Sequence, residues 1–438
     1  MTPALSDFLA LDLAALLTAA CAGVSCALLG SLLLLRRQSL LGDAISHAVL
    51  PGLVAAFILA GTRAGAPMFI GAAIAGVGAA LLVELVRRST RLDDQTATAV
   101  VFPVMFALGV VLIEQTAASG VDLDVDCVFN GLLERVIWLE LADGVQRADL
   151  QSLPRELITS AGAMLAIALL VALFFKEIRL CSFDPALAGA LGFRPGLVGL
   201  GLTVLTAGAV VASFEAVGSI LVLALLVCPA ATARLLTDRF GRQLWLSVIL
   251  GLVASVGGYF AATRGPMLLG SDAALSAAGM MAVVAGLLLL GAALFAPRHG
   301  VLGKALRRAH AGVAIAREDL LADLHRLGEG RPADDLPTRR QGLARRVALA
   351  WATRRGEVQA STAGPALTAR GRTEAQRIVR AHRQWETYLV REVGLRPDHV
   401  HDAAERLEHA VRPDALASPD APAPSGRDPQ GREIPPAV

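Results

Sequence analysis

An aspartate and a histidine stand four residues apart in a largely apolar stretch, Arg36–Gly52 (RRQSLLGDAISHAVLPG). Side chains at i and i+4 lie on one helix face, so the Asp43 carboxylate and the His47 imidazole would point the same way. An ionisable group inside lipid costs about 2.5–3.5 kcal/mol on insertion scales, and a metal ion or an aqueous path can offset that cost. The pair therefore predicts a site of metal passage or gating. The alternative is a snorkelling aspartate beside a core histidine that is hydrogen-bonded to a neighbouring helix.

Two more groups of histidine and glutamate lie near the carboxyl end. Arg380–Glu386 (RAHRQWE) places His382 and Glu386 at i and i+4. Val400–His409 (VHDAAERLEH) places a second group on about one helical face: His401, Glu405, Glu408 and His409. Nitrogen and oxygen ligands of this kind suit a first-row divalent ion. A solvated helix with surface ion pairs is the alternative for each segment.

The composition separates two parts of different chemistry. The chain has 438 residues, of which 55% are hydrophobic and 18% charged, which is not typical of a soluble protein. Apolar runs of ~20 residues, the length of a membrane span, continue to about position 297. Seven of the eight histidines follow Arg298 and all five cysteines precede it. The cysteines form no CxxC pair, so neither a disulfide framework nor a zinc ribbon is expected.

The apolar runs predict nine membrane spans. They are expected near residues 10–35, 42–62, 67–86, 97–114, 157–175, 196–213, 217–236, 244–262 and 273–296. Arginine clusters fall on one side of the membrane if the amino terminus is outside and the carboxyl terminus inside. Pro51-Gly52 predicts a kink in the second span.

A short helix is expected in the inside connection Phe183–Pro195. Asp184-Pro185 is a typical helix start and Gly192 a typical stop. Such a helix, parallel to the membrane, suits docking into a groove on a partner, and an ordinary interfacial connector is the alternative. The chain has two lysines and no GxxxxGK[ST] motif for binding nucleotide phosphates. We therefore expect this chain to be no ATPase, so that any energy from ATP must come from another chain.

Four separated segments resemble the membrane permeases of ATP-driven manganese, zinc and iron importers. They are Arg36–Gly52, Leu92–Gly109 (LDDQTATAVVFPVMFALG), Phe183–Gly192 (FDPALAGALG) and Val217–Leu236 (VGSILVLALLVCPAATARLL). The resemblance implies an all-α polytopic protein of the cell inner (cytoplasmic) membrane, acting as a homodimer or with a related permease. It implies an ATP-binding subunit and an extracytoplasmic metal-binding protein as partners, and no permanently bound cofactor. It also implies coupling to the ATPase through Asp184, Pro185, Ala188, Leu191 and Gly192.

Leu367–His409 resembles the metal-binding and dimerisation segment of the iron- and manganese-dependent repressors of the diphtheria-toxin-repressor type. The resemblance implies metal ligands at His382, Glu386, His401, Glu405, Glu408, His409 and Asp319. Glu405 stands where iron-type repressors carry cysteine and manganese-type repressors glutamate, which favours a harder ion. A second acid, expected one turn after Asp319, is replaced by Ala322, with Asp323 beside it.

The segment before it suits a full DNA-binding domain less well. Residues 298–371 are expected to be a linker and a degenerate winged-helix-like segment, a few residues short of a complete one. Its arginines could contact phosphate, anionic lipid or the partner ATPase. Tethering to a membrane argues against DNA as a partner. Residues 372–416 would be the repressor-like helices, and 417–438, rich in Pro, Asp, Ala and Gly, a disordered tail.

Together these features predict the permease subunit of an importer for divalent manganese, zinc or iron, with manganese favoured, and a cytoplasmic metal-sensing domain. The metal would be the cargo and a regulatory ligand. The main rival is a membrane-anchored metal-responsive regulator that does not transport. An intramembrane metalloenzyme is disfavoured because the spans contain no HExxH motif and no paired catalytic acids.

Overall fold

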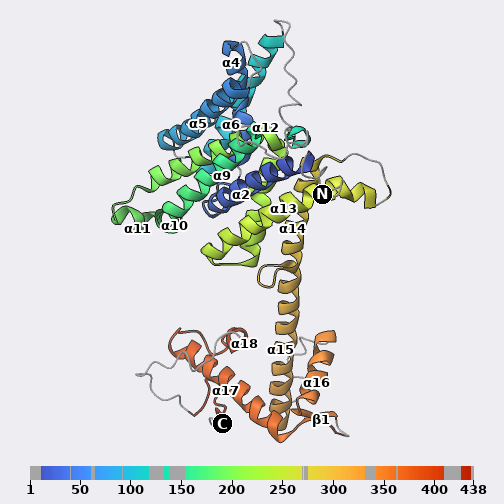
Figure 1. Ribbon diagram of the computed structural model, residues 1–438. Coiled ribbons are helices and arrows are strands. Elements are labelled where there is room, and N and C mark those ends of the chain that lie inside the picture. Colours follow the sequence, from blue (N-terminus) through green and yellow to red (C-terminus); the bar gives the residue numbers. More distant parts are fainter. Residues whose placement is uncertain are drawn as a thin grey trace. The chain divides into compact units, whose positions relative to one another are not determined.

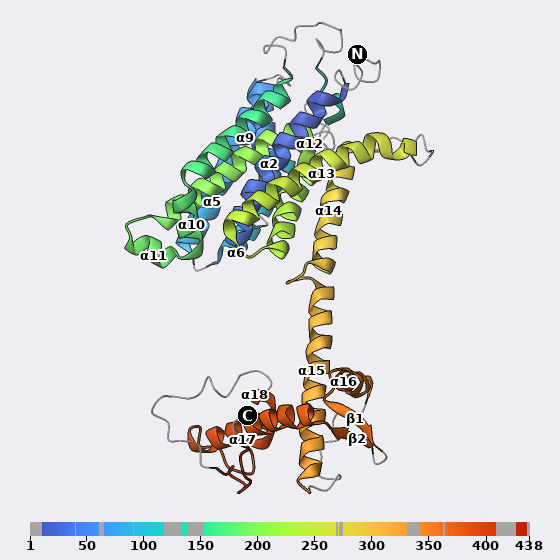
Figure 2. The ribbon, with the colours of Figure 1, turned by 60° about the horizontal axis from the view of Figure 1, so that its bottom comes forward.

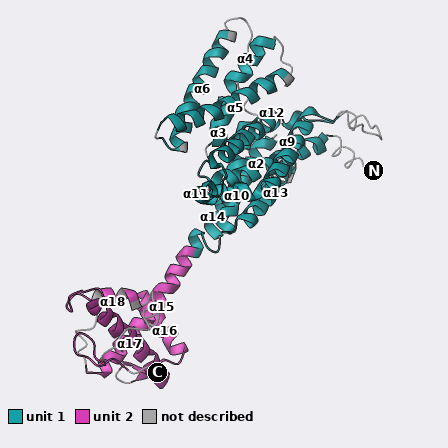
Figure 3. Cartoon of the chain, turned by 90° about the vertical axis from the view of Figure 1, so that its left-hand side faces the viewer, with its two compact units in different colours: residues 1–303 teal, residues 304–438 magenta. Residues whose placement is uncertain are grey.

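The computed structural model consists of two compact units, residues 1–303 and residues 304–438 (Figure 3). It describes residues 11–39, 41–60, 65–90, 92–117, 133–138, 153–268, 270, 275–330, 342–361, 364–408 and 426–435. Each unit is considered by itself.

The first unit is built from helices alone within its described residues (Figure 1). They are α2 (Leu13–Leu35), α3 (Leu41–Ala48), α4 (Leu50–Ala60), α5 (Gly65–Ser89), α6 (Asp94–Ala117), a short 3-10 turn η2 (Leu133–Arg135), α9 (Arg155–Leu173), α10 (Phe175–Phe183), α11 (Pro185–Ala190), α12 (Pro195–Leu236), α13 (Phe240–Leu268) and α14 (Ala277–Phe295). Among the described residues, nine segments are long and apolar enough to cross a membrane. This number confirms the nine predicted spans.

Helix α12 contains two of these spans, Pro195–Phe214 and Ala216–Leu236. Gly218 interrupts its helical geometry with φ 76° and ψ 167°. Gly199 lies against the Arg36 guanidinium, and Gly30 against the Leu226 carbonyl. Gly30 and Arg36 are only about 9 Å apart along α2, whereas a straight helix would separate Gly199 from Leu226 by about 40 Å. The chain therefore folds back at Gly218, as the separate predicted spans require.

Helix α2 forms the centre of this unit and packs against α9, α12 and α13. Its buried positions are mainly alanine, glycine and serine. Small residues let helix backbones approach closely, which is how helices associate in lipid. At Gly30 the Leu226 carbonyl leaves no space for a side chain.

The second predicted span is broken between α3 and α4. Helix α3 ends at Ala48 and α4 begins at Leu50. Pro51 has no N–H to continue the hydrogen-bond ladder, and the N–H groups of Gly52 and Leu53 both donate to the Val49 carbonyl. The predicted kink is thus found, and it places Asp43 and His47 on the separate short helix α3.

The second unit is formed by α15 (Val301–Gly328), which begins three residues before it, α16 (Leu343–Arg354), a β-hairpin, α17 (Ala369–Arg391) and α18 (His401–Glu408) (Figure 2). The hairpin pairs β1 (Val358–Ser361) with β2 (Gly364–Leu367) in antiparallel register, with Val358 opposite Leu367. Helix, hairpin and helix follow one another as in a winged helix. Thr368 caps α17 by accepting a hydrogen bond from the Gly371 N–H at 3.1 Å.

Part of the tail expected to be disordered has a defined fold in the structure. Within residues 426–435, Arg427 and Glu433 form an isolated antiparallel bridge. Arg380 Nη1 on α17 donates to the Pro435 carbonyl at 2.6 Å, and Arg383 donates to the Glu433 carbonyl. The composition of the tail predicted disorder, because composition carries no information about the contacts that Arg380 and Arg383 of α17 make with the tail.

Candidate functional site

Asp43 and His47 lie on one face of α3, as their spacing predicts. His47 Nε2 is 3.7 Å from Asp43 Oδ1. The Asp43 side chain is 42% exposed in the single chain and the His47 side chain 29%, so neither is sealed inside the helix bundle. A separation of 3.7 Å between an imidazole nitrogen and a carboxylate oxygen lets one ion contact both atoms at about 2.0–2.2 Å.

Aromatic side chains of α6 fix the orientation of the His47 ring. Its centroid is 5.1 Å from that of Phe102 and 5.6 Å from that of Phe106, and the Phe106 ring stands perpendicular to it. These are favourable edge-to-face separations. The rings lie four residues apart on α6, one on each side of Pro103, so this helix helps to position the imidazole.

The short inside helix, α11, has the capping that the sequence predicts. Asp184 Oδ1 accepts a hydrogen bond from the Leu187 N–H at 2.9 Å, and Pro185 occupies the first turn. Gly192 ends the helix with φ 87°, a left-handed conformation. Leu187 and Leu191 are exposed, whereas Ala188 is buried. The two leucines can therefore meet a partner, and Ala188 can only anchor the helix to its own unit.

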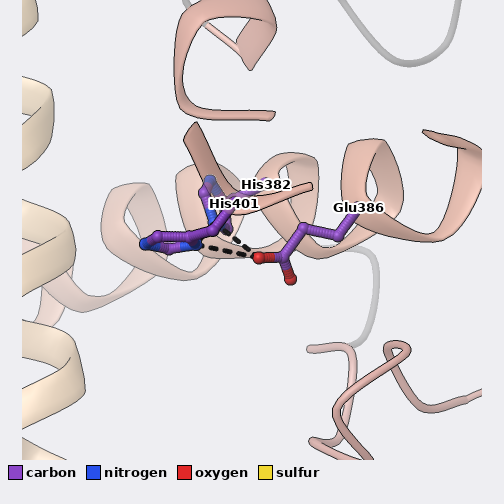
Figure 4. A group of neighbouring side chains, drawn as sticks. All are labelled: His382, Glu386 and His401. Carbon is purple, nitrogen blue, oxygen red and sulfur yellow. Dashed lines mark hydrogen bonds and ion pairs between the residues drawn. The ribbon is translucent and has the colours of Figure 1, made fainter. Parts of the chain in front are cut away.

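In the second unit three predicted ligands converge on one point (Figure 4). His382 Nε2 lies 3.1 Å from Glu386 Oε1 and 2.9 Å from His401 Nδ1, and His401 Nδ1 lies 2.9 Å from Glu386 Oε1. His382 and Glu386 belong to the buried face of α17, and His401 is the first residue of α18. We call these three residues the His–Glu cluster.

The two helices are held in place by an apolar cluster beside these ligands. Trp385 and Leu389 of α17 pack with Val400 and Ala404 at α18. The buried positions of α17 recur every three or four residues, the spacing of an amphipathic helix, and His382 and Glu386 fall within that stripe. Helix packing therefore brings predicted ligands from two helices together.

The charge state of the cluster is suited to a cation. Burial by itself raises the pKa of the Glu386 carboxyl, but hydrogen bonds from His382 and His401 outweigh it and lower that pKa to about 2. Glu386 Oε2 is buried and has no hydrogen-bond partner among the residues that the structure describes. An orphaned buried carboxylate oxygen next to two imidazole nitrogens fits a divalent ion, which would give it a partner.

Two other ligands expected from the resemblance, Glu405 and Asp319, are not part of this cluster among the described residues. Glu405 lies one turn after His401 on α18 and is partly buried, and Asp319 lies on α15. Both act electrostatically on a third acid, Asp323 of α15, whose pKa burial raises to about 6. Asp323 is therefore near these acids, and its i+4 spacing from Asp319 is the sequence signal for it. The Glu408 side chain and His409 lie outside the described residues.

Sequence reasoning missed Arg383, which links three parts of the second unit. It is buried, its Nη2 donates to Glu329 Oε2 at 2.8 Å, and its Nε lies 3.9 Å from Asp428 Oδ2. Glu329 directly follows α15, and Asp428 belongs to the tail. The available signal was that Arg383 falls within the stripe of α17 that recurs every three or four residues and is buried.

Comparison with known proteins identifies both parts of the chain. Residues 368–436 match the iron dependent repressor, metal binding and dimerisation domain. Residues 10–136 and 149–296 match the ABC 3 transport family. The ordered tail residues thus fall within the repressor-like match.

Curated relatives share the first unit. The zinc transport system membrane protein TroD of Treponema pallidum is 37% identical over 295 residues, covering 66% of this chain and 75% of TroD. The manganese transport system membrane protein MntD of Bacillus subtilis is 39% identical over 288 residues, covering 65% of this chain and 92% of MntD.

A solved structure, PsaBC from Streptococcus pneumoniae in complex with Fab, is similar with a TM-score of 0.51 and 30% identity. The similarity covers 65% of this chain and 92% of that one. The relatives are membrane permease subunits, not enzymes, and they share the helical first unit described above. This chain therefore belongs to the ABC 3 transport family, as a multi-pass membrane permease of the metal-transporting kind that carries a repressor-like domain at its carboxyl end.

Proposed function

We propose that this chain is the permease subunit of an ATP-driven importer of a divalent transition metal ion, with manganese as the favoured cargo. The Asp43–His47 pair carries the proposal, because it supplies a carboxylate oxygen and an imidazole nitrogen within reach of one ion. The names of the relatives TroD and MntD refer to zinc and manganese transport, which supports the class of cargo.

Transport needs two partners and a second permease. An ATP-binding subunit would contact α11 through Leu187 and Leu191, and an extracytoplasmic metal-binding protein would deliver the ion on the opposite face. The second permease would be another copy of this chain or a related one. Alternating access follows if ATP binding moves α11 and the spans then open to the other side. The inner membrane and a cytoplasmic carboxyl terminus are part of this proposal.

The second unit would bind the transported metal as a regulatory ligand. His382, Glu386 and His401 would hold the ion. When bound, the ion would compensate the negative charge of Glu386 and link α17 to α18. Asp319, Glu405, Glu408 and His409 are the further ligands that the repressor resemblance implies. Sensing on the inner side would let imported metal report its own concentration, and DNA is not needed as a partner.

Metal uptake into proteoliposomes that contain the permease and its ATP-binding subunit tests the transport proposal. The Asp43→Ala/His47→Ala variant should lose ATP-dependent manganese uptake while it folds and assembles normally. A matched control is Asp238→Ala/His299→Ala, because this is another Asp–His pair of the first unit, with His299 Nε2 3.0 Å from Asp238 Oδ1. Uptake by Asp43→Ala/His47→Ala at the wild-type rate would overturn the role of the pair.

A regulator that does not transport is the second candidate, and the His–Glu cluster is the observation that favours it. It requires metal binding by the second unit and no uptake by the wild-type assembly. Equilibrium dialysis of residues 301–438 against manganese, iron(II) and zinc measures that binding. Binding should be lost in His382→Ala/Glu386→Ala and kept in Glu374→Gln, whose carboxylate pairs with Arg377 elsewhere on α17.

A further inference from the structure

Three phenylalanine rings meet where α10 and α13 come together in the first unit. Phe175 is the first residue of α10, Phe183 is its last, and Phe240 is the first residue of α13. The Phe175 ring stacks on the Phe240 ring with their centroids 5.3 Å apart, and the Phe183 ring meets the Phe240 ring edge-on at 5.6 Å. Both geometries are favourable for aromatic pairs. Phe240 therefore contacts both ends of α10, and we call these three residues the aromatic clamp.

One end of the clamp is joined directly to α11. Phe183 is followed by Asp184, the N-cap of α11. The Asp184 N–H donates to the Leu180 carbonyl at 3.0 Å, so the hydrogen bonding of α10 continues up to this cap. Leu187 and Leu191 of α11 are exposed and can meet a partner. A displacement of α11 must therefore carry Phe183 with it.

The other end of the clamp reaches the interior of the unit. Phe175 and Phe240 pack against a buried apolar cluster to which α2, α9, α10, α12 and α13 all contribute. Leu244, one turn after Phe240, belongs to this cluster. Helix α12 also packs on α3, which carries Asp43 and His47. Because closely packed interiors transmit strain, a movement of Phe240 can reach the frame of the proposed transport site.

The properties of the two contacting rings suit a mechanical link better than core filling. Phe183 is 58% exposed in the single chain, so filling the core does not account for its contact with Phe240. A phenyl ring is rigid, whereas a methionine side chain has three rotatable bonds and adapts to its surroundings. A displaced Phe183 ring must therefore move the Phe240 ring or lose contact with it.

We propose that Phe240 is a positioning residue for transport, which passes displacements of α11 to α13 and the apolar cluster. When the ATP-binding subunit moves α11, Phe183 displaces the Phe240 ring, and α13 moves with it. This inference rests on the proposed contact between α11 and the ATP-binding subunit. The role involves no contact of Phe240 with metal or nucleotide, so its substitution should separate ATP hydrolysis from metal uptake.

The first test measures uptake and hydrolysis together in proteoliposomes that contain the permease and its ATP-binding subunit. In Phe240→Ala the number of metal ions taken up per ATP hydrolysed should fall at least about 5-fold, the lower end of typical coupling between two sites. The two subunits should still copurify and hydrolyse ATP. Trp245→Ala is the matched control and should keep the wild-type ratio, because Trp245 lies on the same helix and is 73% exposed.

Further variants separate the ring contact from the filling of space. Phe240→Leu keeps a large apolar side chain without a ring, so it should still lower the ratio, and it covers the case in which Phe240→Ala does not fold. Phe240→Tyr keeps the ring and should retain the wild-type ratio. Phe183→Ala should also lower the ratio. The double variant Phe183→Ala/Phe240→Ala should be no worse than Phe240→Ala, because both substitutions remove the same contact.

Amide hydrogen exchange gives a second readout that does not depend on metal transport. Binding of the ATP-binding subunit and nucleotide should change exchange in α11 and in residues 240–250 of the wild-type permease. In Phe240→Ala the same addition should change exchange in α11 alone. No change in wild-type α11 would refute the proposed contact with the ATP-binding subunit, whereas a wild-type change confined to α11 would overturn the role of Phe240.

A purely structural role of Phe240 predicts a different set of results. Assembly, ATP hydrolysis and uptake would then fall in parallel in Phe240→Ala, or Phe240→Leu would keep the wild-type ratio. Additive losses in the double variant would mean that Phe183 does not act through Phe240. Each of these results would overturn the proposal. Hydrolysis without uptake in the wild type would instead refute the transport proposal, and the exchange measurement would still test Phe240.

Discussion

Glu386 of α17 and His401 of α18 are joined through Oε1 and Nδ1 at 2.9 Å, and His382 reaches the same oxygen at 3.1 Å. The helix that carries His401 spans only eight residues, His401–Glu408. So short a helix is not stable by itself in water and depends on its packing against α17. The contact between Glu386 and His401 is thus a polar link between the long helix α17 and the short helix α18, which depends on such contacts for its stability.

Metal binding should therefore order α18. Adding manganese should slow amide hydrogen exchange in residues 401–408 by at least about 10-fold. The reason is that a ligand present at a concentration of 100 times its Kd, and bound only by the folded helix pair, stabilises that pair by about 2.7 kcal/mol. Exchange in α16, which contributes none of the three ligands, serves as the internal control. Unchanged exchange at α18 with saturating metal would contradict the assignment of His401 as a ligand.

Arg383 should hold the tail to α17. Replacing it in Arg383→Ala removes the hydrogen bonds to Glu329 and to the Glu433 carbonyl, and also removes the cation that lies 3.9 Å from the buried Asp428 carboxylate. We expect residues 426–435 to become sensitive to limited proteolysis, since a buried charge that loses its partner typically costs about 3–5 kcal/mol. Arg377→Ala, which removes an exposed ion pair with Glu374 on the same helix, should leave the tail protected. Equal cleavage of both variants would show that the tail is held by other contacts.

The sequence was informative wherever the signal was local. Apolar run length predicted the spans, and the Asp184 cap and Gly192 stop predicted α11, because each depends on a few neighbouring residues. The i, i+4 spacing of His382 and Glu386 placed both on one face, but only the packing of α18 on α17 decides that His401 joins them and Glu405 does not. Arg383 was missed, and Asp323 was noted beside Ala322 without a role of its own, because the roles of both depend on partners tens of residues away.

Gly30 should be intolerant of any side chain. Its Cα faces the Leu226 backbone, and a Cβ there would overlap the carbonyl oxygen, which cannot move independently of α12. Gly30→Val should cost at least about 1–3 kcal/mol, the range for overpacked sites, and lower the yield of monodisperse protein in gel filtration. Gly208→Ala on α12 serves as the control, because among the described residues no atom outside the adjoining backbone of its own helix lies within 4 Å of the Cβ position. A normal elution profile for Gly30→Val would mean that α2 and α12 can separate without loss of the fold.

Leu187 and Leu191 should decide assembly with the ATP-binding subunit. Leu187→Asp/Leu191→Asp places charges on the exposed face of α11 and should abolish copurification of the two subunits, while Leu187→Met/Leu191→Met should preserve it. Asp184→Ala should weaken assembly less, because loss of a helix cap costs about 1 kcal/mol. Full copurification of the aspartate variant would remove α11 from the interface.

Asp323 should make the second unit less stable as the pH rises. Burial raises the pKa of its carboxyl from 3.8 to about 6, although Arg326 and Arg345 oppose the shift. The folded state therefore favours the protonated acid: its contribution is fully present below pH 3.8 and is lost as the pH rises through 6. A pKa raised from 3.8 to about 6 corresponds to roughly 3 kcal/mol. Urea unfolding of residues 301–438 in the presence of a chelator, followed by tryptophan fluorescence, should show that loss of stability between pH 4 and pH 6.

The Asp323→Asn variant should flatten this pH profile and be about 2–3 kcal/mol more stable than wild type at pH 7. Asp398→Asn, at an exposed position, should follow the wild-type profile. A wild-type profile without this slope would mean that Asp323 stays solvated, and that the acids on α15 and α18 do not share a buried environment.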